Sequence, residues 1–236
     1  MREERFCIGH IPAVLCGEPS DRVWLFLHGK HGRKEEGLDF AELACPKGWQ
    51  VLSIDMPEHG QRQGSPEKLV PWTVAPELKA VMNYARSHWS QVALRANSIG
   101  AWFAMQAFAI APPVRSLFVS PILDMAELIR SMMGWAGVTE ADLEARGEIA
   151  TAFGETLSWR YWQYALDHPI TRWDSPTAVL YGGADNLTPR RTAEAFVARF
   201  HADLTVMEDG EHWFHTPEQL DVLRRWTLTN LEEDSL

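Results

Sequence analysis

Arg95-Ala96-Asn97-Ser98-Ile99-Gly100-Ala101 is the stretch of the chain that says most about its fold. It follows a short apolar run at 91–94 and opens a segment, 100–111, that is apolar nearly all round. The run predicts a buried strand and the segment a buried helix. Small residues two positions before and two after Ser98 allow the strand and the helix to approach closely. The stretch therefore predicts a sharp strand-to-helix turn that exposes the Ser98 hydroxyl.

Other apolar runs end in loops rich in Gly, Asp, His and Pro. These runs lie at 23–27, 50–54, 116–119, 177–181 and 203–207. Continuous apolar runs are typical of strands buried on both faces, as in a parallel sheet. We expect helices to alternate with them at 75–88, 189–200 and 217–228. The pattern predicts a three-layer α/β domain, with helices on both faces of a mostly parallel central sheet and a short antiparallel hairpin at 6–16.

Two of the expected helices share a start motif. The segments 189–200 and 217–228 each open with Thr-Pro, at Thr188-Pro189 and Thr216-Pro217. This pair predicts a threonine N-cap followed by a proline at the first helical position.

The segment 121–176 interrupts the alternation, because it is much longer than an ordinary crossover between strands. It is rich in Met, Trp and Tyr. We expect a single domain over 1–236, with 121–176 as a helical cap inserted within it. The aromatic residues of the cap are expected to pack it onto the body or, as a lid, to line an apolar substrate pocket.

Composition excludes several classes of protein. The chain has 236 residues, of which 46% are hydrophobic and 23% charged, as in ordinary globular proteins. Its net charge of −10 is unlike that of a nucleic-acid-binding protein. No stretch resembles a signal peptide or is long and apolar enough to span a membrane.

Cys7, Cys16 and Cys45 form no CxxC pair, so we expect reduced thiols in a cytoplasmic protein, without a zinc or redox motif.

Two further polar residues follow predicted strands. Asp185 lies after the run at 177–181, and His212 lies after the run at 203–207. In an open parallel sheet such loops line one crevice. A serine nucleophile needs a base, and the base needs an acid to orient it. We therefore expect Ser98 as nucleophile, His212 as base and Asp185 as acid, whereas the simplest alternative is that Ser98 only caps a helix.

Other assignments of these roles stay open. His215 is a second candidate base, and Asp124, after the run at 116–119, is a second candidate acid. His59 is expected to order its own loop. No pair of His, Asp or Glu at ligand spacing converges on Ser98, so no metal site is expected.

The chain resembles small serine hydrolases of the α/β-hydrolase superfamily, most of all the esterase-like and dienelactone-hydrolase-like members. The motifs that carry the resemblance are Leu27-His28-Gly29, Asp55-Met56-Pro57-Glu58-His59-Gly60, Ala96-Asn97-Ser98-Ile99-Gly100, Gly182-Gly183-Ala184-Asp185 and Gly210-Glu211-His212. The chain departs from the family pattern at Ala96, where a glycine is usual. It also has a serine where dienelactone hydrolases use a cysteine. The resemblance implies an α/β-hydrolase fold, no cofactor, and an oxyanion hole formed by the backbone N–H groups of Ile99 and Lys30.

Candidate substrate-binding residues are His28, Trp135, Trp159 and Trp213. The basic cluster Lys30, His31, Arg33 and Lys34 is expected to be a solvated loop, or else to receive an anionic group of the substrate.

The resemblance implies hydrolysis of a carboxylic ester through a Ser-His-Asp acyl-enzyme mechanism. The alternatives are an acyl thioesterase, an amidase or peptidase with the same triad, and a non-catalytic binding protein on the same fold. The expected partner is a small-molecule ester or thioester, with no nucleic acid and no membrane span, and the protein is expected to be a monomer or a homodimer.

Overall fold

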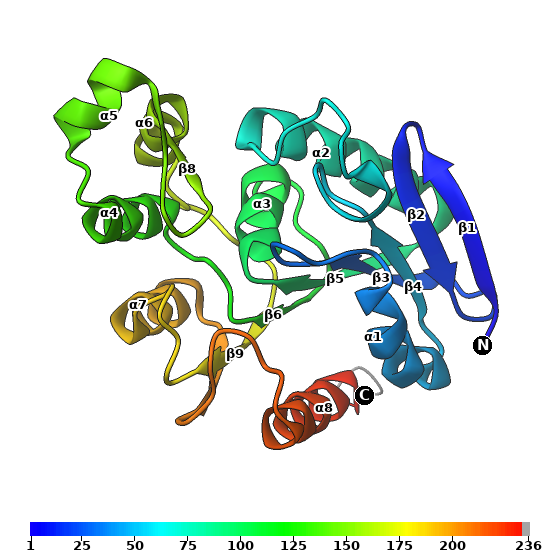
Figure 1. Cartoon of the computed structure of the whole chain (residues 1–236). Helices are drawn as coiled ribbons and strands as arrows, with labels where there is room; N and C mark the ends of the chain where they lie inside the picture. Colours follow the sequence, from blue (N-terminus) through cyan, green and yellow to red (C-terminus); the bar gives the residue numbers. More distant parts are fainter. Residues whose placement is uncertain (233–236) are drawn as a thin grey trace.

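A computed structural model of the chain describes residues 1–232, and its centre is an eight-stranded sheet with the order β1-β2-β4-β3-β5-β6-β9-β10 (Figure 1). The strands are β1 (Glu3–Ile8), β2 (Ile11–Cys16), β3 (Arg22–Leu27), β4 (Gln50–Ile54), β5 (Gln91–Asn97), β6 (Ser116–Val119), β9 (Thr177–Gly182) and β10 (Asp203–Met207). β1 and β2 form an antiparallel hairpin at one edge, β2 pairs antiparallel with β4, and the remaining pairs are parallel. The predicted mostly parallel sheet and its edge hairpin are confirmed.

Helices cover both faces of this sheet (Figure 1). The helices are α1 (Glu36–Ala44) and α8 (Pro217–Glu232) on one face, and α2 (Pro71–His88), α3 (Ile99–Phe108) and α7 (Arg190–Phe200) on the other. Short 3₁₀ turns follow α1 at η1 (Cys45–Lys47) and β4 at η2 (Gly60–Arg62). The predicted three layers are confirmed. None of the helices within residues 1–232 has both the length and the apolarity to cross a membrane.

Each face of the sheet has its own apolar core. In β3, Val23, Leu25 and Leu27 belong to the core under α2 and α3. Trp24 and Phe26 belong to the core under α1 and α8. The alternation follows from the period of two in a strand. Because β3 is buried on both sides, its sequence is a continuous apolar run.

The segment 121–176 follows β6 and returns the chain to β9. It contains α4 (Met125–Ala136), α5 (Glu140–Arg146), the hairpin of β7 (Glu148–Ala150) with β8 (Thr156–Ser158), and α6 (Trp159–Asp167). The hairpin was not predicted from the sequence. α6 lies against the body through Tyr161 and Tyr164, whose rings contact Trp72 of α2 and Trp102 of α3. α4 is joined to α7 by hydrogen bonds from Arg191 and Thr192 to Glu127.

Candidate active site

Ser98 lies at the turn between β5 and α3. Its backbone has φ 49° and ψ −123°, which is rare for a residue other than glycine. This conformation places the side chain at the carboxyl edge of the sheet. A Cβ at Gly100 would lie 2.6 Å from the carbonyl oxygen of His28, so only glycine allows α3 to pack this closely on the end of β3. Ala96 is fully buried within β5, where one methyl group is accommodated.

A continuous chain of hydrogen bonds runs from Ser98 to Asp185. The Ser98 Oγ lies 2.8 Å from Nε2 of His212, and Nδ1 of His212 lies 2.7 Å from Oδ2 of Asp185. The Asp185 carboxylate is fully buried, and its Oδ1 accepts the backbone N–H groups of Leu187 and Thr188. This network favours the tautomer in which Nδ1–H of His212 donates to Asp185 and Nε2 accepts the Ser98 proton.

The structure brings Ser98, Asp185 and His212 together from three strand ends, after β5, β9 and β10 respectively. The two alternative residues are engaged elsewhere. Asp124 is the N-cap of α4 and accepts the backbone N–H of Glu127 at 2.9 Å. Nδ1 of His215 lies 2.7 Å from the carbonyl oxygen of Trp213.

The loop between β3 and α1, residues 28–35, lies beside Ser98. A Cβ at Gly29 would be 3.2 Å from Cβ of Ser98. Next to Gly29, the backbone N–H of Lys30 donates to no acceptor within residues 1–232, and the same holds for Ile99 at the start of α3. Ile99 directly follows Ser98, and Lys30 directly follows Gly29, so these two N–H groups are the candidate donors of an oxyanion hole.

His28 and His59 both order the loops around this site. His28 is fully buried, its Nδ1–H donates to the carbonyl oxygen of Gly29, and its Nε2 accepts the N–H of Met56 at 3.0 Å. Burial lowers the pKa of His28 from its ordinary 6.5 to about 4. Nε2 of His59 accepts the N–H of His31 at 2.9 Å. With both ring nitrogens bonded inside the protein, His28 shapes the loop and has no ring nitrogen left for a substrate.

The basic cluster is not a uniformly solvated loop. His31 and Arg33 are exposed, and the Lys30 ammonium pairs with Glu155 in the turn between β7 and β8. Lys34, however, is buried and pairs with Asp55 at the end of β4. The expectation of a solvated loop is wrong for Lys34, because a buried carboxylate requires a counter-charge and hydrogen-bond donors. The local sequence gave no sign that Lys34 and Asp55 form a pair.

The three tryptophans proposed for the substrate have different environments. Trp213 directly follows His212, is 74% exposed and stacks on His215. Trp135 of α4 is 53% exposed and meets Phe153 edge to face. Trp159, the first residue of α6, is partly buried against the core. Their substrate contacts stay a prediction.

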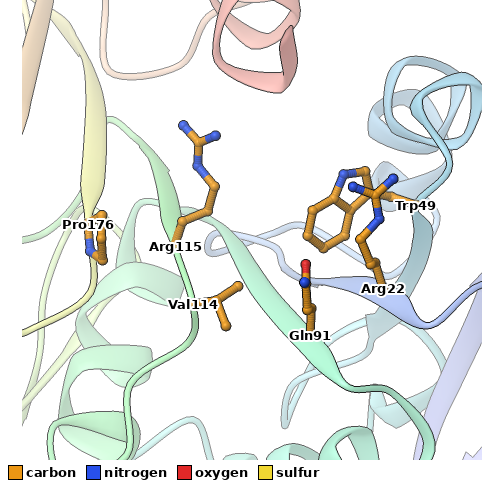
Figure 2. Close-up of a pocket in the computed structure, with 6 residues that line it drawn as sticks. All are labelled: Arg22, Trp49, Gln91, Val114, Arg115 and Pro176. Atoms are coloured by element: carbon orange, nitrogen blue, oxygen red, sulfur yellow. The ribbon is translucent and has the colours of Figure 1, made fainter. Parts of the chain in front are cut away.

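A hollow of about 300 Å³ lies at the other end of the sheet (Figure 2). It is lined by Arg22, Trp49, Gln91, Val114, Arg115 and Pro176. Arg22 and Gln91 are the first residues of β3 and β5, whereas Ser98, Asp185 and His212 all follow the ends of strands. This hollow is therefore separate from the candidate active site.

A sequence model of the Alpha/beta hydrolase family matches residues 24–225, which include all the residues of the candidate site. A search of curated proteins found no match to the chain.

Several solved structures share the fold across nearly the whole chain. Est1E from Butyrivibrio proteoclasticus with bound ferulic acid is 19% identical, covers 98% of this chain and 98% of its own, and has a TM-score of 0.81. A putative hydrolase from Agrobacterium vitis is 19% identical, with coverages of 96% and 98% and a TM-score of 0.76. A monoacylglycerol lipase from Paleococcus ferrophilus is 16% identical, with coverages of 94% and 98% and a TM-score of 0.70. Identities this low establish the fold alone.

Proposed function

Since the chain belongs to the alpha/beta hydrolase family, we propose that it is a serine hydrolase that cleaves a carboxylic ester of a small molecule. The observation that carries this proposal is the hydrogen-bond chain from Ser98 through His212 to Asp185. A binding protein would have no need for a serine held in a strained conformation against a histidine whose tautomer is fixed by a buried carboxylate.

The proposed reaction has two halves. Ser98 Oγ attacks the ester carbonyl carbon while Nε2 of His212 takes its proton, and Asp185 stabilises the imidazolium. The N–H groups of Lys30 and Ile99 stabilise the negative oxygen of the tetrahedral intermediate. The carbon–oxygen bond to the alcohol breaks, and the alcohol takes the proton from His212. Water then gives a proton to His212, attacks the acyl-enzyme and releases the carboxylic acid, and Ser98 regains its proton.

We further propose that the acyl part of the substrate is apolar or aromatic. The cap supplies Trp135 and Phe153, and Trp213 lies next to the catalytic histidine. Concave sites lined by such side chains select apolar groups. We expect kcat/KM for p-nitrophenyl esters to rise from acetyl to octanoyl. Flat selectivity would contradict this part of the proposal. A feruloyl ester belongs in the panel because Est1E, a protein of the same fold, binds ferulic acid.

The test is hydrolysis of this ester panel and of matched acyl-CoA thioesters by the wild type and by Ser98→Ala. We expect the substitution to lower kcat by at least about 10⁴-fold, because it removes the nucleophile. Ser120→Ala is the matched control. Ser120 is a buried serine with φ 43° that follows the neighbouring strand β6, and its Oγ has no partner within residues 1–232. Turnover retained in Ser98→Ala would contradict the proposal.

A further inference from the structure

A buried ion pair joins the β3–α1 loop to the loop after β4. Nζ of Lys34 lies 2.7 Å from Oδ2 of Asp55. The side chain of Lys34 is 1% exposed and that of Asp55 is 0% exposed. Lys34 is only four residues from Lys30, the proposed oxyanion donor. A buried pair of charges is costly to form unless its remaining hydrogen bonds are also made, so its other contacts indicate its role.

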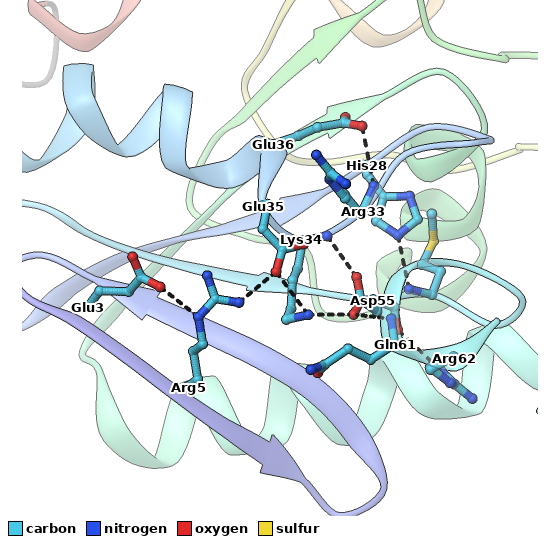
Figure 3. A network of polar contacts seen from close by, with 11 residues as sticks. Glu3, Arg5, His28, Arg33, Lys34, Glu35, Glu36, Asp55, Gln61 and Arg62 are labelled. Carbon is cyan, nitrogen blue, oxygen red and sulfur yellow. Dashed lines mark hydrogen bonds and ion pairs between the residues drawn. The ribbon is translucent and has the colours of Figure 1, made fainter.

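One of those contacts is a second ion pair, in which Nζ of Lys34 lies 3.2 Å from Oε1 of Glu35, and the others are with the backbone of the two loops (Figure 3). Oδ1 of Asp55 accepts the N–H of Lys34 at 2.8 Å, and Oδ2 accepts the N–H of Gln61 at 3.0 Å. The backbone at Gly60 has φ +51°, and a Cβ there would overlap the Asp55 carboxylate. The loop after β4 thus wraps around the carboxylate. The carboxylate in turn holds the Lys34 backbone as well as its ammonium group.

Two histidines fix the same loop on either side of Lys30. Nε2 of His28 accepts the N–H of Met56, and Nε2 of His59 accepts the N–H of His31. Lys30 therefore lies between His28 and His31, both of which are bonded to the loop after β4. The Lys34–Asp55 pair holds the distal end of the same stretch. The short segment that carries the Lys30 N–H is anchored at both ends to one neighbouring loop.

We propose that Lys34 and Asp55 are positioning residues, which hold the β3–α1 loop so that the Lys30 N–H faces the space beside Ser98. The catalytic consequence rests on the proposed function. Neither side chain touches the substrate in this scheme; they act through the backbone of Lys30. Losing one oxyanion donor lowers kcat by about 10²- to 10³-fold, so a displaced donor should cost about 10- to 100-fold.

The experiment compares Lys34→Met and Asp55→Asn with the control Glu77→Gln. Glu77 pairs with the buried Arg62 and with His10, and it makes no polar contact with residues 28–35. All three variants therefore remove one charge from an ion pair, and the two pairs lie in the same part of the fold. The readouts are Tm, kcat and KM for the best ester, and the inhibition constant of a trifluoromethyl ketone with the same acyl chain, whose serine adduct carries the oxyanion.

We expect Lys34→Met and Asp55→Asn to lower kcat about 10- to 100-fold and to raise the inhibition constant of the ketone by a similar factor. KM should change less than about threefold. Glu77→Gln should lower Tm, because it leaves the buried Arg62 without its partner, while kcat and ketone affinity stay within about twofold of wild type. A folded Lys34→Met with wild-type kcat and ketone affinity would overturn the proposal. A loss of kcat in Glu77→Gln as large as that in Lys34→Met would also overturn it.

A double variant separates positioning from stability. Replacing both charges, in Lys34→Met with Asp55→Leu, removes the unpaired buried charge and should restore much of the Tm that each single change costs. It does not restore the bonds to the N–H groups of Lys34 and Gln61. We expect Tm to recover while kcat and ketone affinity stay low. Recovery of all three would show that the pair only stabilises the fold.

Hydrogen exchange of residues 28–33 tests positioning without any turnover. Protection of this segment should fall in Lys34→Met and stay at the wild-type level in Glu77→Gln. If the wild type neither hydrolyses an ester nor reacts with a fluorophosphonate, the proposed function fails, and lost protection still supports the anchoring of the loop. Unchanged protection in a folded Lys34→Met overturns the anchoring, whatever the activity.

Discussion

Ser98 has a backbone conformation that costs about 1–3 kcal/mol and persists only because its surroundings hold it. Its N–H donates to Val119 in β6, and its carbonyl accepts the N–H of Ile122. The close contact of Gly100 with the end of β3 completes this support. The backbone of Ser98 is therefore held by contacts with β6, with the segment that follows β6 and with the end of β3.

Gly100→Ala should lower kcat by about 10- to 100-fold, because the new methyl group would push α3 and Ser98 away from His28. Ala96→Gly is the control. It should leave kcat within about twofold and lower the free energy of unfolding by about 0.5–1 kcal/mol, the usual effect of glycine in a strand. Ester kinetics and urea unfolding measure both effects. Wild-type kcat in Gly100→Ala would contradict the role of the close contact.

Acid should destabilise the protein through His28. Its pKa is lowered from 6.5 to about 4, so between these values the unfolded state binds more protons than the folded state. This stability is fully present above pH 6.5 and is lost as the pH falls toward 4. The loss amounts to about 3 kcal/mol. In His28→Gln, the free energy of unfolding should fall less steeply over this window. The free energy of unfolding is measured by urea titration at each pH. If it falls equally steeply in the wild type and in His28→Gln, His28 is not the group responsible.

Asp185→Asn and Asp124→Asn should differ sharply in their effects. Asn at 185 favours the wrong tautomer of His212 and should lower kcat by about 10⁴-fold. Asn at 124 caps a helix about as well as Asp, so kcat should stay within about twofold. Steady-state kinetics on one ester give kcat for both variants and the wild type. The reverse order of effects would make Asp124 the catalytic acid.

At the scale of elements, aromatic rings join α6 of the segment 121–176 to α2 and α3. Tyr161 and Tyr164 of α6 contact Trp72 of α2 and Trp102 of α3, with ring centroids 5.9–6.3 Å apart. The Tyr161 hydroxyl is buried and has no hydrogen-bond partner within residues 1–232. Burial raises the pKa of Tyr161 well above its ordinary value. The ring therefore contributes packing, and its hydroxyl contributes a desolvation cost.

Tyr161→Phe should raise the free energy of unfolding by about 1 kcal/mol, because it removes an unpaired buried hydroxyl and keeps the ring. Trp102→Ala, which removes the ring on the other side of the contact, should lower it by about 3–5 kcal/mol. Chemical denaturation of the three proteins measures both. A destabilised Tyr161→Phe would reveal a partner for the hydroxyl, such as a bound water.

The starts of α7 and α8 show that a tertiary contact can override a local capping motif. Thr216 accepts the N–H of Gln219 and caps α8, as predicted. Thr188 was predicted to cap α7 in the same way, and that prediction is wrong. α7 begins at Arg190 with Pro189 as its N-cap. The Thr188 hydroxyl instead donates to Pro121, and its N–H donates to Asp185. Thr188 therefore bonds to Asp185 and Pro121 and does not cap α7.

At the scale of the whole molecule, the parallel sheet explains why the candidate site could be predicted. Ser98, Asp185 and His212 each follow an apolar run, and parallel strands put the ends of such runs at one edge. The order of the strands, the β7–β8 hairpin and the burial of Lys34 could not be predicted. They depend on pairings between residues distant in sequence, which local apolar periodicity does not encode. The cytoplasmic location and the oligomeric state stay predictions.

The most direct test of the central claim, an activated serine at position 98, is labelling by a fluorophosphonate followed by intact mass and peptide mapping. The wild type should gain one adduct, located on Ser98, because His212 and Asp185 activate that hydroxyl. Ser98→Ala should gain none, and Ser120→Ala should react like the wild type. A folded wild type that stays unlabelled, or a Ser98→Ala protein that labels equally well, would contradict the claim.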